Sequence, residues 1–197
     1  NEFMLLKKLK DVSLLNEQSL NVYKAINSKT VDIPFKPIST FLTSLNNNSK
    51  EKIALVTKRP TPINVVKVDY THGKRIVDAY FEKQSTTDYN GVYKGKYVDF
   101  EAKSTRSTTS FPMANICKHQ IEHLKNVLYF GGIAFFIIQF ESLKEVYLLD
   151  ASYIIDFYEN GDRKSIPYKE IQNKGIKIKQ GINPRLNYID CVEQNYF

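Results

Sequence analysis

The segment Lys96–Lys103 carries two of the residues best able to do chemistry in this chain. It alternates apolar and polar residues, and a β-strand turns successive side chains to opposite faces. As a strand it would have an apolar and a polar face, formed respectively by Val98, Phe100, Ala102 and by Tyr97, Asp99, Glu101, Lys103. A carboxylate two residues before a lysine also occurs on solvated strand faces. Glu101 and Lys103 by themselves therefore do not identify a site.

Asp88 supplies a second carboxylate if the chain between it and Glu101 forms a β-hairpin. With a turn at Lys94-Gly95, the numbers of facing residues sum to about 189, and Asp88 then lies opposite Glu101. Facing residues in an antiparallel pair have Cβ atoms about 5 Å apart. A tight turn at Asn90-Gly91 is the alternative, and it would leave Asp88 beside Tyr93. We favour the first of these turns.

Two carboxylates at that separation predict a divalent-metal site. They repel one another unless a cation lies between them, and Mg²⁺ prefers oxygen ligands while it keeps several waters. A bound metal would activate a water and polarise a phosphate. Lys103 lies one strand repeat from Glu101, where it would orient that water or stabilise charge on the phosphoryl oxygens. Asp88, Glu101 and Lys103 are therefore the predicted catalytic residues for phosphodiester hydrolysis.

Two further side-chain oxygens are candidates for the same metal. Thr86 shares the face of Asp88 if that segment is extended. Gln120 lies on the apolar stripe of the helical segment Ala114–Tyr129. A buried glutamine needs a partner, because unsatisfied burial costs about 1–3 kcal/mol. The partner of Gln120 is either a backbone group or the metal and its water.

Hydrophobic patterning predicts the elements that position these residues. Strands are expected at Ile53–Val56, Ile63–Tyr70, Arg75–Phe81, Lys96–Lys103, Ile133–Phe140 and Val146–Leu149. Helices are expected within Phe3–Ile26, over Ala114–Tyr129 and from Ser152, with a Ser/Thr-rich loop over Ser104–Ser110. Pro34 and Pro37 indicate a linker over Asp32–Ser39. We therefore expect an N-terminal helical extension over residues 1–50 and an α/β domain over residues 51–197.

The charge pattern suggests a nucleic-acid partner. The runs Ile63–Tyr70 and Arg75–Phe81 are joined by a short basic connection, which predicts a projecting hairpin over about residues 60–80. Such hairpins often reach across nucleic acid, although many are only exposed hairpins. The formal charge of +7 is too modest to establish DNA binding by itself. Basic residues interleaved with Tyr, Ser and Thr suit phosphate contacts, and the candidates are Lys74, Arg75, Lys94, Lys96 and Arg106.

Composition bounds the class of protein. The chain has 197 residues, 42% of them hydrophobic and 25% charged, which is typical of a globular protein with one substantial core. No run approaches the roughly 18 apolar residues of a membrane-spanning helix. Cys117 and Cys191 are far apart and predict no disulfide framework, and the pair His119 and His123 lacks a third ligand for zinc. No secretory signal pattern is present, so we expect a cytoplasmic protein.

Several motifs resemble those of one nuclease family. Asp88 followed by Glu101-Ala102-Lys103 resembles the D…(E/D)xK signature of restriction-endonuclease-like nucleases, which is a weak signal because these residues are common. Longer segments resemble the RecU family of Holliday-junction resolvases over roughly Ile53 to Phe197. These segments are Lys58-Arg59-Pro60-Thr61-Pro62, Ala79-Tyr80-Phe81, Ser85-Thr86-Thr87-Asp88-Tyr89-Asn90-Gly91, Tyr97–Lys103, Thr109-Ser110-Phe111-Pro112, His119-Gln120-Ile121-Glu122-His123, Pro184–Ile189 and Glu193-Gln194.

This resemblance implies a restriction-endonuclease-like α/β fold, in which a mixed β-sheet is flanked by helices and a β-hairpin stalk protrudes. It implies a homodimer that resolves four-way DNA junctions by symmetric nicks during recombination and DNA repair. It also implies Mg²⁺, with Mn²⁺ as a substitute, held by Thr86, Asp88, Glu101 and Gln120, with Lys103 stabilising the transition state. Recombinase and branch-migration proteins are candidate partners. A symmetric dimer suits a junction, because a junction presents two equivalent strands.

The chain departs from the family pattern in two places. Its first 50 residues lack a clean Asn-Arg-Gly turn and acidic first helix, so no N-terminal catalytic carboxylate is assigned. The loop Thr71–Lys74 is shorter, so Lys74 or Arg75 would replace the stalk arginine. Three hypotheses follow: a junction resolvase, which we favour, a general DNA endonuclease of the same fold, and a non-cleaving junction-binding protein. The intact Asp88, Glu101 and Lys103 set argues against the third.

Overall fold

A computed structural model of the chain describes residues 45, 48–49, 51–60, 63–71, 73–81 and 86–197. These residues belong to a compact unit that spans Phe41–Phe197. The helices predicted within Phe3–Ile26 and the linker predicted over Asp32–Ser39 lie outside the described residues. The division at residue 50 stays a prediction.

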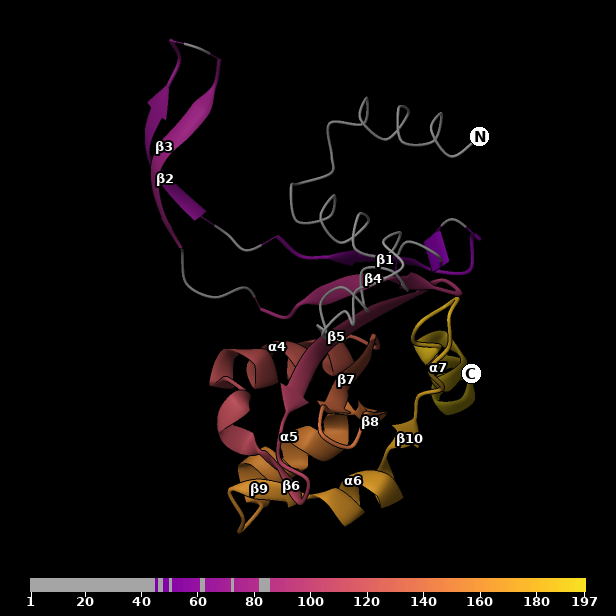
Figure 1. Ribbon diagram of the computed structural model, residues 1–197. Coiled ribbons are helices and arrows are strands. Elements are labelled where there is room, and N and C mark those ends of the chain that lie inside the picture. The colour runs from indigo at the N-terminus through magenta and orange to yellow at the C-terminus, as the bar shows by residue number, and fades with distance from the viewer. Residues whose placement is uncertain (1–44, 46–47, 50, 61–62, 72, 82–85) are drawn as a thin grey trace, which may run out of the picture. The chain divides into compact units, whose positions relative to one another are not determined.

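A six-stranded mixed sheet forms the centre of the described domain (Figure 1). Its strand order is β1-β4-β5-β7-β8-β10, and only β5 and β7 run parallel. The strands are β1 (Leu55–Lys58), β4 (Tyr89–Tyr93), β5 (Lys96–Thr105), β7 (Ile133–Phe140), β8 (Glu145–Asp150) and β10 (Ile176–Lys177). The prediction of an α/β fold with a mixed sheet flanked by helices is confirmed.

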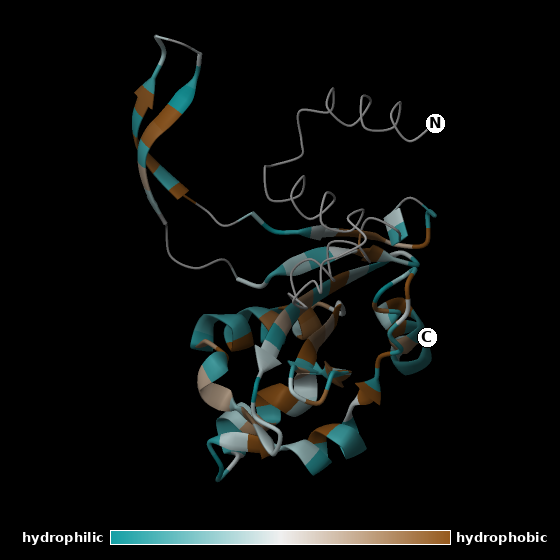
Figure 2. Ribbon diagram, in the orientation of Figure 1, coloured by the Kyte–Doolittle hydropathy of each residue, from teal (hydrophilic) through white to brown (hydrophobic). Residues whose placement is uncertain are grey.

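Strand β7 is buried along its whole length, because side chains cover both of its faces. Phe135 and Ile137 belong to the same core as α7 (Tyr188–Tyr196). Phe136 and Ile138 belong to a second core, which contains residues of α4 (Lys118–Tyr129) and α5 (Ala151–Asn160). In Figure 2 the hydrophobic colour is strong on β7. The sheet is therefore sandwiched between α7 on one face and the pair α4 and α5 on the other.

Helix α4 is the crossover between the two parallel strands, since parallel neighbours cannot be joined by a tight turn. It ends at Tyr129 and is followed by the Gly131-Gly132 pair, where Gly131 has a φ of +79°. The amide of Gly132 donates to Val127 O and that of Gly131 to Leu128 O, which together form a Schellman end. This crossover lays α4 across the face of the sheet that carries the even-numbered residues of β7.

The hairpin predicted near residues 60–80 forms a two-stranded sheet of its own, made of β2 (Ile63–Asp69) and β3 (Arg75–Phe81). Many of its apolar side chains are exposed, and Figure 2 shows hydrophobic residues on both strands. Tyr70 and Tyr80 are 71% and 60% exposed. A hairpin with this exposed surface has apolar and aromatic groups available to a partner.

Other predictions needed correction at their ends. The first strand begins at Leu55 and not Ile53, and β5 continues through Thr105, so the Ser/Thr-rich loop is shorter than predicted. The helical segment predicted over Ala114–Tyr129 is split into a 3₁₀ turn, Met113–Asn115, and α4. Five elements were not predicted: β6 (Ser110–Pro112), β9 (Ser165–Pro167), α6 (Tyr168–Lys174), β10 and α7. None of the helices built from the described residues has the length and apolar character of a membrane span.

Candidate active site

The hairpin of β4 and β5 fixes which residues face one another. Tyr93 pairs with Lys96 and Tyr89 with Phe100, so facing numbers sum to 189 as predicted. The connection is the two-residue loop Lys94-Gly95, in which both residues have positive φ, 46° and 78°. Loops of this type match the natural twist of paired strands. The same register, continued by one residue, sets Asp88 opposite Glu101.

The alternative turn at Asn90-Gly91 is wrong, because both residues lie inside β4. Gly91 is needed there for a different reason. A Cβ atom at this position would lie 2.1 Å from Leu55 O of the neighbouring strand β1. Glycine therefore allows a close approach of two backbones and does not form a bend.

Glu101 is almost fully buried, with 2% of its surface exposed, and it contacts both other predicted catalytic residues. Its Oε2 accepts a hydrogen bond from the Asp88 amide at 3.0 Å, and its Oε1 lies 2.9 Å from Lys103 Nζ. Burial and the nearby Asp88 carboxylate raise the pKa of Glu101 to about 7, although Lys103 opposes this change. The structure thus brings Asp88, Glu101 and Lys103 together at one place.

Asp99 is the centre of a cluster of polar side chains on the same face of β5. Its carboxylate is fully buried and forms an ion pair with Arg59 at 2.6 Å. It also accepts hydrogen bonds from the Tyr97 hydroxyl at 2.7 Å and from the Thr87 hydroxyl, and its Oδ2 lies 2.9 Å from His123 Nε2. We call these five residues the Asp99 cluster. Tyr97 and Asp99 come from β5 and His123 from α4, while Arg59 directly follows β1 and Thr87 lies just before β4.

The surroundings of Asp99 keep it ionised. Burial by itself would raise its pKa, but hydrogen bonds from His123, Arg59, Thr87 and Tyr97 outweigh burial, so the pKa lies below its ordinary value. The sequence indicated only that Asp99 shares a face with Glu101, which a solvated strand would also show. The cluster itself was not predicted.

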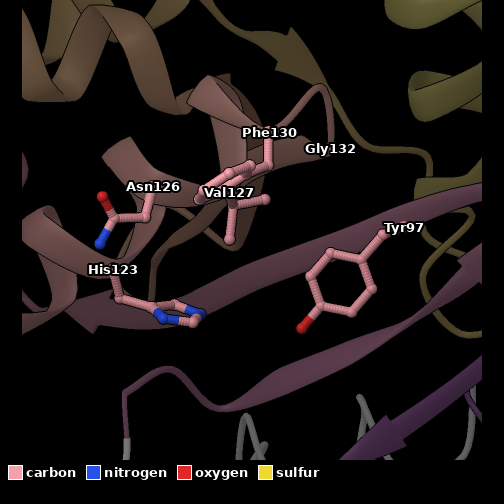
Figure 3. A pocket seen from close by; sticks show the side chains of 6 residues that line it. All are labelled: Tyr97, His123, Asn126, Val127, Phe130 and Gly132. Atoms are coloured by element: carbon pink, nitrogen blue, oxygen red, sulfur yellow. The ribbon is translucent and has the colours of Figure 1, made fainter.

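A hollow of 390 Å³ lies beside the Asp99 cluster. Figure 3 shows that the rings of Tyr97 and His123 face one another across it, with Val127 and Phe130 along its wall. The Nε2 atom of His123 already contacts the Asp99 carboxylate. Among the described residues, no group of three or more His, Cys, Asp and Glu side chains could hold a metal. A metal at Asp88 and Glu101 would therefore need other oxygen ligands.

The two predicted accessory ligands have different surroundings. Gln120 is buried on α4, and its Oε1 accepts a hydrogen bond from the Cys117 amide at 3.0 Å as part of a capping box. The backbone partner considered for a buried glutamine is therefore present. Thr86 is exposed in a bend two residues before Asp88. Their roles as metal ligands stay predictions.

The predicted DNA-contacting residues divide into two groups. Lys74 and Arg75 are exposed at the turn end of the β2–β3 hairpin. The others already have protein partners: Lys94 pairs with Glu193, Lys96 lies over the Phe197 ring and Arg106 pairs with Glu141 at 3.4 Å. Arg106 keeps 91% of its side chain exposed, so this pair leaves it accessible.

Comparison with known proteins gives a consistent family. The chain is 53% identical over 150 residues to a Geobacillus protein named Holliday junction resolvase RecU, a match covering 74% of this chain and 75% of that one. It is 45% identical over 184 residues to the Streptococcus gordonii protein of the same name, covering 90% and 92%. A solved structure of Archaeoglobus fulgidus Hjc, described as a Holliday junction resolvase, is similar at 10% identity and a TM-score of 0.43, covering 71% of this chain and 94% of that one.

The last likeness is too remote for a conclusion, whereas the family match is extensive. The sequence profile described as "RecU: Recombination protein U" matches residues 39–194. That range contains every residue of the site described above. The chain therefore belongs to the RecU family.

Proposed function

We propose that this protein is an Mg²⁺-dependent endonuclease that resolves four-way DNA junctions. The observation that carries the proposal is the meeting of Asp88, Glu101 and Lys103 on one face of the β4–β5 hairpin. Family membership agrees with it, since the similar Geobacillus and Streptococcus gordonii proteins are both named Holliday junction resolvases. The chemistry of the three residues supports cutting, and their family supports the substrate.

The donor set of the site fits Mg²⁺. Two carboxylates from adjacent chain segments offer hard oxygen ligands, and the raised pKa of Glu101 reflects unrelieved burial and repulsion that a cation would relieve. We propose Thr86 and Gln120 as the further protein ligands. When bound, Mg²⁺ supplies a polarised phosphate and a more acidic water. Mn²⁺ offers the same preference for oxygen ligands and is a reasonable substitute.

Lys103 has a separate task. Its ammonium lies 2.9 Å from Glu101 and its side chain is 20% exposed, so it is anchored yet open to a ligand. A fixed positive charge in a site with little water stabilises negative charge that develops on phosphoryl oxygens. We propose that Lys103 stabilises the transition state in this way.

The substrate would be held mainly by positive charge outside the catalytic residues. Lys74 and Arg75 on the hairpin are the first candidates, followed by Lys96 and Arg106, which remain exposed beside their protein partners. We further propose a homodimer that nicks two strands symmetrically, because a four-way junction has two equivalent strands. We also propose that the protein acts in the cytoplasm.

Labelled four-way junctions and matched linear duplexes, incubated with protein and Mg²⁺, test this function. We expect paired symmetric nicks in the junction and little cutting of the duplex. Asp88→Ala should abolish cutting and leave junction binding intact. Asp162→Ala, at an exposed carboxylate outside the site, should leave both cutting and binding intact. Equal cutting of both substrates would identify a general endonuclease. Binding without products would indicate a non-cleaving junction-binding protein.

A further inference from the structure

The Asp99 cluster connects the three segments that carry the proposed metal ligands. Thr87 directly precedes Asp88, and Asp99 lies two residues before Glu101 on the same face of β5. His123 follows Gln120 by one turn of α4. Asp99, which shares β5 with Glu101, thus contacts one residue in each of the other two ligand-bearing segments.

Asp88 depends on contacts beyond the strand ladder for its position. Strand β4 begins at Tyr89, so Asp88 lies just outside it. Its carbonyl accepts a hydrogen bond from the Arg59 amide at 2.8 Å. The Arg59 guanidinium reaches the Thr87 hydroxyl, which in turn donates to Asp99. Arg59 therefore holds this segment through its backbone and through its side chain.

These contacts oppose a force that acts before any metal binds. The register sets the carboxyl groups of Asp88 and Glu101 opposite one another, and when both are ionised their repulsion favours moving the Asp88 segment away from β5. A buried ion pair such as Arg59 with Asp99 adds little net stability, because desolvation offsets the Coulomb attraction. Its directed hydrogen bonds instead restrict where the attached segments lie.

We propose that Asp99 is a positioning residue which, through Thr87 and Arg59, holds Asp88 opposite Glu101 so that the metal site exists before the metal arrives. The proposal rests on the metal site of the proposed function. It deepens that function by assigning a task to residues that touch neither metal nor DNA. Outer contacts of this kind change metal affinity about 10–100-fold when they are removed.

Thr87→Val tests the proposal, because valine keeps the shape of threonine and removes only the hydroxyl. Without metal, hydrogen exchange of the Asp88 amide should become at least about tenfold faster, since the Asp88 segment is no longer held where its amide can donate to Glu101. Calorimetric titration with Mg²⁺ should show affinity lowered about 10–100-fold. Junction affinity in EDTA should stay within about twofold of wild type, because the cluster makes no proposed DNA contact. Thr87→Ser restores the hydroxyl and should restore both exchange and affinity.

Two further variants separate positioning from general loss of stability. Asp99→Asn should lower Mg²⁺ affinity at least as much as Thr87→Val. Ile171→Ala creates a cavity in the core around α6 and should lower the melting temperature without changing Mg²⁺ affinity. A folded Thr87→Val protein with wild-type Asp88 exchange and wild-type Mg²⁺ affinity would overturn the proposal. If the wild type neither binds Mg²⁺ nor cuts, the proposed function fails, and the metal-free exchange data still decide whether the cluster holds Asp88.

Discussion

Replacing Glu101 by glutamine should remove the effect of pH on stability that arises at this site. Burial and Asp88 raise the pKa of Glu101 from 4.5 to about 7. The folded protein therefore binds this proton more tightly than the unfolded chain does. The stability that results is fully present below pH 4.5 and is lost as pH rises through about 7. Glutamine has no charge to bury, so Glu101→Gln escapes this loss.

The size of this pH effect on stability follows from the shift in the pKa of Glu101. One pKa unit corresponds to about 1.4 kcal/mol, so the stability of Glu101→Gln relative to wild type should increase by about 2–3 kcal/mol between about pH 5 and about pH 8. The comparison with wild type removes the contributions of other carboxyl groups. Urea unfolding in EDTA at both pH values measures the two free energies of unfolding.

Mg²⁺ should offset the stability that wild type loses when Glu101 ionises. At about pH 8 and a concentration of 100 times the dissociation constant, it should stabilise wild type by about 2.7 kcal/mol, and Glu101→Gln by much less. A difference in stability between wild type and Glu101→Gln that is the same at both pH values would refute the reasoning. Glu101 would then titrate normally, and its burial beside Asp88 would need another account.

Three other outcomes are expected. Lys103→Ala should lower the single-turnover cutting rate about 10²–10³-fold while junction affinity stays unchanged, which rapid-quench and band-shift measurements would check. Lys74→Ala with Arg75→Ala should weaken junction binding and reduce the slope of log affinity against log salt by about 2; an unchanged slope contradicts their contact with phosphates. Gly91→Ala should lower the free energy of unfolding by about 1–3 kcal/mol and the melting temperature by several degrees, because the added Cβ would lie 2.1 Å from Leu55 O.

The geometry around Asp88 was predictable because local rules determine it. Strand alternation assigned Glu101 and Lys103 to one face, and the two-residue loop Lys94-Gly95 set the pairing. Both rules act within about fifteen residues of sequence. Gly91 was the ambiguous position, since glycine suits both a turn and a close backbone approach. Only the neighbouring strand β1 decides between them.

The Asp99 cluster was not predictable in the same way. Arg59 lies 40 residues before Asp99 and His123 lies 24 residues after it, so only the folded chain brings them together. An aspartate in an alternating strand reads as solvent-exposed until a helix is known to cross that face. The sequence held one usable signal, since Asp99 shares a face with Glu101 and α4 must cross the sheet between two parallel strands.

The C-terminal elements were missed for a different reason. Strands β9 and β10 contain three and two residues, and α6 contains seven, too few for a clear hydrophobic period. Such short elements are stable only through tertiary packing. Ile166 and Ile171 are fully buried in the core that also contains residues of α4 and α5, which explains why these segments are ordered.

The loop Lys94-Gly95 makes the active site sensitive to length more than to composition. With this two-residue loop, Asp88 faces Glu101 because equal numbers of residues separate the two acids from the loop. Inserting or deleting one residue in either strand, with the loop unchanged, would shift the register by one residue and turn a carboxylate to the α7 side of the sheet. Many substitutions in this hairpin would be tolerated by the backbone, but a single-codon insertion or deletion within one of its strands would separate the two acids. Homologous chains that cut DNA should therefore vary in sequence between these acids and keep the spacing constant.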